Sequence, residues 1–428
     1  MRYVLAVLAL LVLLVAVAAG ALTRSLERDV ASAENAWKTR LGGRSFVEAY
    51  PARPANETAL RLEETALRIG IDLAPAAAKT RRHVDAETKK RFAAIDTALK
   101  DFGRAAQGED DRGLPEPDPV LAAFLASNRD AAADATRLLL DSPEQHWERD
   151  LSQGFATDLP NGLGALQLQR VLLAEGAIAE RGGDLRSSAR FQEAANRLAT
   201  ATLAEPYLIF QLIGHALIRT ELGFLRHSCA DATAWLGELK NLELRSGVLR
   251  ALDLEAYEAL QQSRSQDPLA YTDDQGRRES PSGWVAGFVR WGLRDYSVRL
   301  QRMNDDLRLV DVARFDPDAD TRRRIESLPR WQPIARLLWP AFGDALPRAA
   351  RTELAIELTL LAREERAKPT PSTWSRRPSA VEGLQWLRRS SQGVVTIEID
   401  HDLTFKSPKD LPLLAVVHPD RCPPLRYD

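Results

Sequence analysis

The stretch VLAVLALLVLLVAVAAGAL, residues 4–22, contains neither a charged nor a polar side chain. Its nineteen residues would form a helical rod of about 28 Å at 1.5 Å per residue, close to the hydrocarbon thickness of a bilayer. In a spanning helix the backbone polar groups pair internally while the apolar side chains face lipid. The stretch therefore predicts a transmembrane helix, with residues 1–23 forming a membrane anchor or signal segment.

A cleaved secretory signal is the alternative for this segment. Ala19-Gly20-Ala21 offers the small residues that a signal peptidase requires, whereas the apolar core of a signal is usually only about 7–15 residues long. No cysteine directly follows the run, which excludes a lipoprotein signal. A buried helix of a soluble protein is the third interpretation. Either of the first two carries the remaining chain across the membrane.

The flanking charges predict the orientation of the span. The amino terminus and Arg2 precede it, whereas the four charged residues between positions 24 and 29 sum to zero. Because positive flanks stay in the cytoplasm, residues 24–428 are expected in the periplasm of a bacterial cell. A later charge-free stretch, Pro206–Ile218, has only 13 residues and predicts a buried core helix. We therefore expect a single-pass inner-membrane protein.

The overall charge is close to zero, with 58 basic and 60 acidic residues, which argues against a nucleic-acid binder. Charge is nevertheless uneven along the chain. Residues 101–160 carry 13 acidic and 5 basic side chains, a net of −8, and residues 321–389 carry 14 basic and 7 acidic side chains, a net of +7. Such asymmetry indicates a partner surface or a membrane-facing patch, unless the two regions face each other or are simply solvated.

Two cysteines occur, Cys229 and Cys422, without a CxxC motif or zinc-ligand spacing. In an oxidising compartment they could pair across roughly 190 residues, a loop whose closure would be worth about 4–5 kcal/mol. The alternative is that each is a small core residue. The sequence leaves both open.

Helical periodicity dominates from residue 24 to about residue 365. The first apolar stripe predicts a stalk that continues the membrane segment and ends at Gly42-Gly43; it comprises Leu26, Val30, Ala33, Trp37 and Leu41. The next helix is expected to begin at the N-cap Asn56 and to end at Pro75, with Leu60, Leu67 and Ile71 on one face. Residues 82–103 predict a third helix.

The middle of the chain predicts packed helices in short hairpins. Residues 164–181 and 185–204 flank the turn Gly182-Gly183-Asp184, followed by Tyr207–Arg226 and two helices over 229–262. Short hairpins in series are the arrangement of α-solenoids. The segment Gly176–Leu198 resembles one tetratricopeptide-type hairpin in Gly176, Ala179, Gly183-Asp184 and Ala189, although Phe191 comes early and no neighbouring copy is found. The resemblance implies a helical repeat fold and no activity.

Breaks at 108–119, 263–283 and 368–379 are rich in Pro, Gly and polar residues. After the last break, Val394–Ile399 predicts a strand, with 403–405 and 413–417 as partners and a helix over Ala380–Arg389. The fold class is mainly α, with an N-terminal transmembrane helix, stacked helical hairpins (α-solenoid-like or an irregular bundle) and a small C-terminal β element. The expected units are 1–23, membrane-proximal helices 24–107, a helical-hairpin domain 119–262, a second helical region 284–366 and an α/β element 380–428.

No nucleotide-binding, hydrolase, zinc-protease or calcium-loop motif occurs. Asp400-His401-Asp402 offers a base beside two acids, yet a solvated turn is the stronger interpretation. His227-Ser228-Cys229 could hold an activated thiol, but a structural role is favoured. Two aromatic groups also favour structural roles over ligand binding: a helix face with Trp284, Phe288, Trp291 and Leu293, and a basic cluster with Trp374, Arg376, Arg377, Trp386, Arg388 and Arg389.

These patterns assign no catalytic, cofactor-binding or metal-binding residue. The leading hypothesis is a non-catalytic scaffold or assembly protein, held to the membrane by residues 4–22, that binds a protein partner through a helical surface. The alternatives are an exported, hydrolase-like enzyme with a site between the helical body and the C-terminal sheet, and a ligand-binding sensor that uses the Trp284–Trp291 face.

Overall fold

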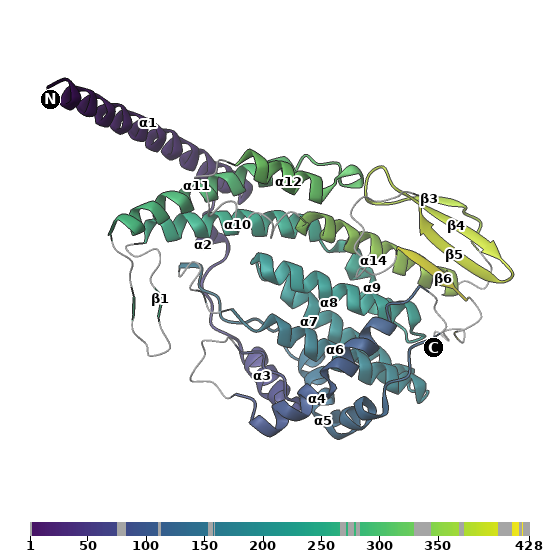
Figure 1. Cartoon of the computed structure of the whole chain (residues 1–428). Coiled ribbons are helices and arrows are strands. Elements are labelled where there is room, and N and C mark those ends of the chain that lie inside the picture. The colour runs from purple at the N-terminus through teal and green to yellow at the C-terminus, as the bar shows by residue number, and fades with distance from the viewer. Residues whose placement is uncertain are drawn as a thin grey trace.

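The computed structural model shows a mainly helical chain with a small antiparallel sheet near its C-terminus (Figure 1), as the sequence predicts. It describes residues 2–74, 83–109, 113–152, 157, 159–265, 271–272, 278–279, 283–328, 344–367, 372–400, 413–418 and 422. The side chains of 2–16, 18, 19, 271, 272, 278, 279, 283 and 284 lie outside this description.

Helix α1, Arg2–Arg40, is one continuous helix that contains both the apolar run and the predicted stalk. Its N-terminal part projects away from the body, whereas its C-terminal part lies against it (Figure 1). The predicted stripe Leu26, Val30, Ala33 and Trp37 is buried in the body. The helix ends at Gly42 and Gly43, whose positive φ angles of 65° and 86° favour glycine over any other residue.

The next helices are α2 (Phe46–Ala49), α3 (Glu57–Ile69), α4 (Ala86–Ala105) and α5 (Pro119–Asp141). Asn56 caps α3 as predicted and accepts a hydrogen bond from the backbone N–H of Ala59. The predicted end and face of α3 are wrong. The helix stops at Gly70, and Leu60 on the predicted face is 41% exposed, because the stripe through Ala59, Leu62, Ala66 and Ile69 meets the core instead.

The central helices are α6 (Gly162–Arg181), α7 (Leu185–Leu203) and α8 (Leu208–His227), then the short α9 (Thr233–Leu236) and η2 (Gly237–Asn241), and α10 (Leu244–Arg264). Helices α6 and α7 form the predicted hairpin about Gly182-Gly183-Asp184. Gly176 lies at their crossing, where a Cβ would come within 3.2 Å of the Phe191 Cβ. This contact accounts for the glycine of the tetratricopeptide-like pattern.

The second half of the body contains α11 (Gly283–Leu307), η3 (Val312–Arg314), α12 (Pro317–Ser327) and α14 (Ala345–Ala367). A two-stranded pair, β1 (Tyr271–Thr272) and β2 (Arg278–Glu279), precedes α11. Helices α10 and α11 pack side by side, and α14 lies between α8 and the sheet (Figure 1).

The sheet has the order β3 (Arg376–Pro378), β4 (Gln385–Ser391), β5 (Val394–Ile399) and β6 (Leu414–Val417), with neighbours antiparallel. Strand β5 has the predicted bounds, and β6 confirms one predicted partner. Residues 403–405 lie outside the described residues. The helix predicted over Ala380–Arg389 is wrong, because Trp386–Ser391 pairs with β5 along its whole length and Gln392-Gly393, both with positive φ, close the hairpin between them.

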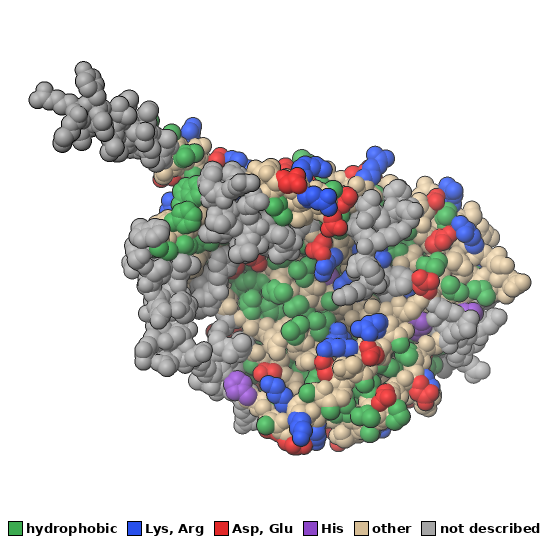
Figure 2. All heavy atoms as spheres, viewed as in Figure 1, with side chains coloured by type: hydrophobic (Ala, Val, Ile, Leu, Met, Phe, Trp, Pro, Cys, Tyr) green, Lys and Arg blue, Asp and Glu red, His purple; other side chains and the backbone are tan. Residues whose placement is uncertain are grey.

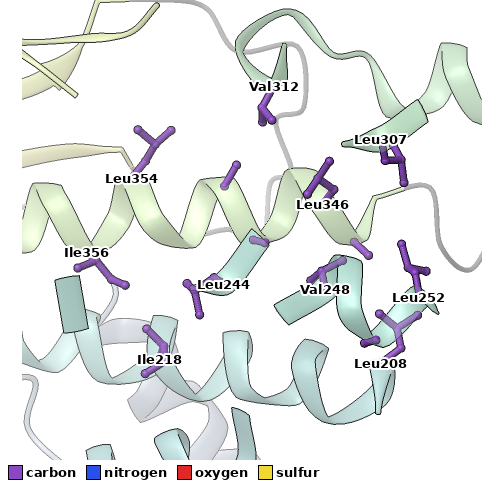
Figure 3. Close-up of a cluster of buried hydrophobic side chains, with 14 of the residues drawn as sticks. Leu208, Ile218, Leu244, Val248, Leu252, Leu307, Val312, Leu346, Leu354 and Ile356 are labelled. Carbon is purple, nitrogen blue, oxygen red and sulfur yellow. The ribbon is translucent and has the colours of Figure 1, made fainter. Parts of the chain in front are cut away.

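Two clusters of buried apolar side chains hold these elements together. One lies among the helices α3, α4, α5, α6 and α7, and the other lies among α1, α8, α10, α11, α14 and the sheet. Figure 3 shows the second cluster, in which Leu208, Val248 and Leu252 converge with Leu346 of α14. Among the described residues, α8 is long and apolar enough to cross a bilayer, but 72% of its most apolar stretch is buried. It is a core helix, as predicted for Pro206–Ile218.

Candidate functional site

The junction between α1 and the body is a polar clamp around a buried aspartate. Arg40 at the end of α1 binds Asp253 of α10 at 2.7 Å, and Arg308, the residue that follows α11, binds the other oxygen of Asp253 at 2.8 Å. Nearby, the indole N–H of Trp37 donates to Gln301. Breaking one partner of such a buried pair leaves a charge without compensation. The clamp therefore fixes α1 rigidly to the body.

A disulfide bond joins Cys229, just after α8, to Cys422 in the C-terminal tail, with the Cα atoms 5.3 Å apart. The sequence left this pairing open. The bond excludes an activated thiol in the triplet His227-Ser228-Cys229. His227 instead hydrogen-bonds the Gly108 carbonyl at 3.3 Å, and Ser228 donates to Glu180.

The C-terminal end of α8 is held from α14. Arg363 donates to the backbone oxygens of Leu225 and Ala230, at 3.1 and 2.6 Å, and Arg366 donates to that of Ser228 at 2.9 Å. These guanidinium groups satisfy carbonyls that the helix leaves unpaired at its end. The residues next to the disulfide thus have a structural role.

Two glutamates lie one turn apart on α10 against the start of α8. Glu258 is 4% exposed, and burial, with a further contribution from nearby Glu255, raises its pKa to about 8. Burial also raises the pKa of Glu255 to about 7, although the N–H of Leu208 donates to its carboxylate. Burial likewise raises the pKa of the neighbouring Tyr207 hydroxyl. The pair is therefore able to take up protons near neutral pH.

An ion-paired group lies close to these glutamates. Glu205, 3% exposed, binds Arg53 and lies 3.5 Å from Arg149, whose guanidinium lies 5.5 Å from the ring centre of Tyr50. Here every charge has an opposite partner. Sequence reasoning missed both groups, although Glu258 follows Leu254 by one turn on the buried side of α10, where an acid is out of place.

An open pocket of about 480 Å³ lies between the end of α3, the start of α4 and the start of α6. Its charged side chains are Asp72, His83, Lys89 and Asp96, and the imidazole Nδ1 of His83 lies 3.8 Å from the Asp72 carboxylate. The ten lining residues include no Ser, Thr or Cys that could serve as a nucleophile. The pocket suits a small polar ligand. Its parts are separated in sequence, and no motif marks them.

Apolar side chains are exposed where α6 and α8 begin, and Figure 2 shows hydrophobic side chains gathered near this end of α8. Leu163 is 67% exposed and Ile209 is 49% exposed. The two helix ends are in contact, because a Cβ on Gly162 would come within 2.2 Å of Ile213. We call Leu163, Ile209 and Ile213 the apolar patch.

The arginines of the basic and aromatic cluster lie on the neighbouring strands β3 and β4, and each has an acidic partner. Trp386 is buried and donates to Glu357 at 2.7 Å, and Arg388 forms a buried ion pair with Glu365 at 3.0 Å. Other ion pairs are Arg376 with Asp400, Arg377 with Glu364 and Arg389 with Glu398. These partners favour the structural interpretation. The contacts with Glu357, Glu364 and Glu365 hold the sheet against α14. His401 and Asp402 lie outside the described residues.

The residues of the predicted aromatic face of α11 differ in their exposure. Leu293 is buried, Trp291 is partly buried against the core and Phe288 is 48% exposed, while the Trp284 side chain is outside the described set.

Among the residues that the structure describes, no three His, Cys, Asp or Glu side chains group as metal ligands. No protein-family model, curated protein or solved structure matches the chain.

Proposed function

We propose that the protein is a membrane-anchored, extracytoplasmic scaffold that binds a protein partner through its helical body. The observation that carries this proposal is the continuity of α1. The same helix begins with the apolar run, projects from the body and is clamped into it through Arg40 and Trp37. The described apolar residues Val17 and Leu22 on the projecting part are 62% and 56% exposed. A bilayer would cover them.

The disulfide supports the extracytoplasmic location. Bonds between cysteines persist in oxidising compartments such as the periplasm and are rare in the cytosol. Cys229 and Cys422 are the only cysteines of the chain, and they are paired.

The apolar patch is the surface that we assign to the partner. It lies at the ends of two helices, where the α6–α7 hairpin meets α8. Stacked hairpins of the α-solenoid type would leave such helix ends free for binding. Burying the remaining exposed surface of Leu163 and Ile209 would contribute about 1–2 kcal/mol each to the association.

Photo-crosslinking tests the partner. A photoreactive residue replaces Ile209 in one variant and Val120 in the control, because Val120 is also apolar and 61% exposed but begins α5. In intact cells we expect one defined crosslinked protein from position 209 that is absent from position 120. The same pattern at both positions, or none at either, would refute a partner at the patch. A C-terminal reporter active only in the cytosol would refute the location.

Ligand binding is the second candidate function, and the pocket beside His83 favours it. Small polar metabolites would be screened by thermal shift of the full chain in detergent. A ligand of this pocket should lose its effect in Lys89→Ala and keep it in Lys90→Ala, which changes the next residue of the same helix outside the pocket. Equal loss in both variants would place the ligand elsewhere.

A further inference from the structure

Helices α6, α7 and α8 enclose buried side-chain oxygens that no described residue satisfies. Glu221 of α8 is fully buried, and neither oxygen of its carboxylate has a hydrogen-bond partner among the described residues. The side-chain oxygens of Asn196 on α7 and Gln169 on α6, which are 1% and 0% exposed, also lack a donor in this part of the chain. Oxygen acceptors buried this deeply are normally paired. We call Gln169, Asn196 and Glu221 the acceptor cluster.

The direction in which Glu221 points follows from contacts on either side of it. A Cβ on Gly214 would come within 2.5 Å of Leu203 on α7. At the other end of α8, the hydroxyl of Ser228 accepts a hydrogen bond from Gln192 of α7 at 2.8 Å. Glu221 is seven residues, almost two helical turns, from both Gly214 and Ser228. It therefore lies between these two contacts on the face of α8 that meets α7.

Asn196 occupies the matching position on α7. It follows Gln192 by about one turn, so the two side chains share the face of α7 that meets α8. The two contacts place position 192 opposite 228 and position 203 opposite 214. Glu221, midway between 214 and 228, is therefore level with positions 197–198 of α7. Asn196 lies within two residues of that level, which is about 3 Å along the helix axis.

Gln169 enters from α6 at the same level. Its amide nitrogen donates to a backbone oxygen of each neighbouring helix, that of Leu217 on α8 at 3.0 Å and that of Ala195 on α7 at 3.5 Å. Leu217 precedes Glu221 by one turn, and Ala195 is next to Asn196. Because these bonds use the nitrogen, the amide oxygen is the atom left for another partner. The three helices thus bring one carboxylate and two amide oxygens to the same place.

These oxygens have the chemistry of a site for a hard cation, which prefers carboxylate and carbonyl ligands. Among the described residues no basic side chain pairs with the Glu221 carboxylate, so the positive charge has to come from elsewhere. One carboxylate balances one positive charge, whereas a divalent ion would leave a net charge buried at a high cost in free energy. A monovalent metal ion therefore fits the cluster better than Ca²⁺ or Mg²⁺.

We propose that the acceptor cluster binds one alkali metal cation, Na⁺ or K⁺, through the carboxylate of Glu221 and the amide oxygens of Asn196 and Gln169. The cation would have a structural role, because it would tie the α6–α7 hairpin to α8 across the contact between them. A proton is the competing occupant, since burial raises the pKa of the Glu221 carboxyl well above its ordinary value. The experiment must therefore separate the cation from the proton.

Equilibrium unfolding in urea tests the cation, because a ligand that binds only the folded state stabilises it, and because unfolding lets a buried ion exchange. The full chain in detergent is unfolded at about pH 8.5, where the proton competes least. Increasing NaCl or KCl replaces choline chloride at a constant total salt concentration. Choline carries the same charge but is too large for a site enclosed by three packed helices, so it controls for general effects of salt.

Three variants locate the effect. Glu221→Gln keeps the shape of the side chain and removes its charge, and Asn196→Leu removes one of the amide oxygens. Glu175→Gln is the matched control, because Glu175 is also buried on α6, at 3% exposure, but lies 3.9 Å from Arg129 of α5 and outside the cluster.

We expect the unfolding constant of the wild type to fall by up to about tenfold for each tenfold rise in Na⁺ or K⁺. This dependence should disappear in Glu221→Gln, weaken in Asn196→Leu and persist in Glu175→Gln. Equal stability of the wild type in all three salts would show that a proton occupies the cluster and would overturn the cation site. A dependence that Glu221→Gln retains, or that Glu175→Gln also loses, would overturn it as well.

A direct count of bound ions keeps the test valid if a variant does not fold. The wild type is refolded from urea in the radioactive form of the ion that stabilises it and is then dialysed to equilibrium against the same solution. One bound ion per chain is expected, and none would overturn the proposal.

Discussion

Replacing Glu258 by glutamine should flatten the dependence of stability on pH. The carboxyl of Glu258 is buried on α10, one turn from Glu255, and has no hydrogen-bond partner at Oε1. An amide of nearly the same shape keeps the packing and never ionises. The substitution therefore isolates the effect of burying this ionisable group.

The magnitude follows from the shift in pKa. A glutamate has a pKa near 4.5 in the unfolded chain, and burial raises that of folded Glu258 to about 8. Between these values the folded state binds the proton more tightly, so stability falls as the pH rises. Below this window both states are protonated, and above it both are ionised. At about 1.36 kcal/mol per pKa unit the loss is roughly 5 kcal/mol across the window.

Urea unfolding of the full chain in detergent, followed by tryptophan fluorescence from pH 5 to pH 9, measures this effect. We expect the wild type to lose up to about 1.4 kcal/mol per pH unit more than Glu258→Gln near pH 6–7. Glu238→Gln, at an exposed position, is the control and should follow the wild type. Parallel curves for the wild type and Glu258→Gln would refute the burial argument.

Three further changes test other features. Cys229→Ser opens the 193-residue loop of the disulfide and should lower stability by about 5 kcal/mol; an unchanged urea midpoint would contradict this. Gly70→Ala puts a side chain on a residue with φ 99°, 2.8 Å from a carbonyl oxygen of α4, so it should lower stability by about 2 kcal/mol or more. Gly103→Ala is the control: it has open space around it within α4 and should raise stability by about 0.5–1 kcal/mol. Arg388→Ala should lower the free energy of unfolding by about 3–5 kcal/mol, because it leaves Glu365 buried without its partner. The double variant Arg388→Met/Glu365→Leu should recover most of this stability. Equal melting temperatures for the single variant and the wild type would show that the buried ion pair is dispensable.

Much of the helical architecture could be predicted from the sequence because helix formation depends on residues within a few positions. Asn56 predicts the start of α3 through its cap, and Gly42-Gly43 predicts the end of α1 through its positive φ angles. The buried face of α3 could not be predicted in the same way. Its stripe is apolar on more than one side, and the position of the core decides that Leu62 is buried while Leu60 is exposed.

Strand β4 in the C-terminal region could not be predicted from local sequence either. Apart from Trp386, the segment Gln385–Ser391 contains no strong β-former, and its pattern fits a helix as well as a strand. Pairing with β5 and the buried partner Glu365 on α14 make it a strand. Strand β5 was predictable because Val394–Ile399 is β-branched throughout most of its length.

The sequence by itself determined the apolar run at residues 4–22, the extent of most helices and the strand at Val394–Ile399, because periodicity and caps act between near neighbours. Only the tertiary structure decided that Cys229 meets Cys422, that Glu258 is buried and that Gly162 lies against Ile213. Burial and pairing depend on which distant segments fold together, and the local pattern of a single chain does not encode that in any short window.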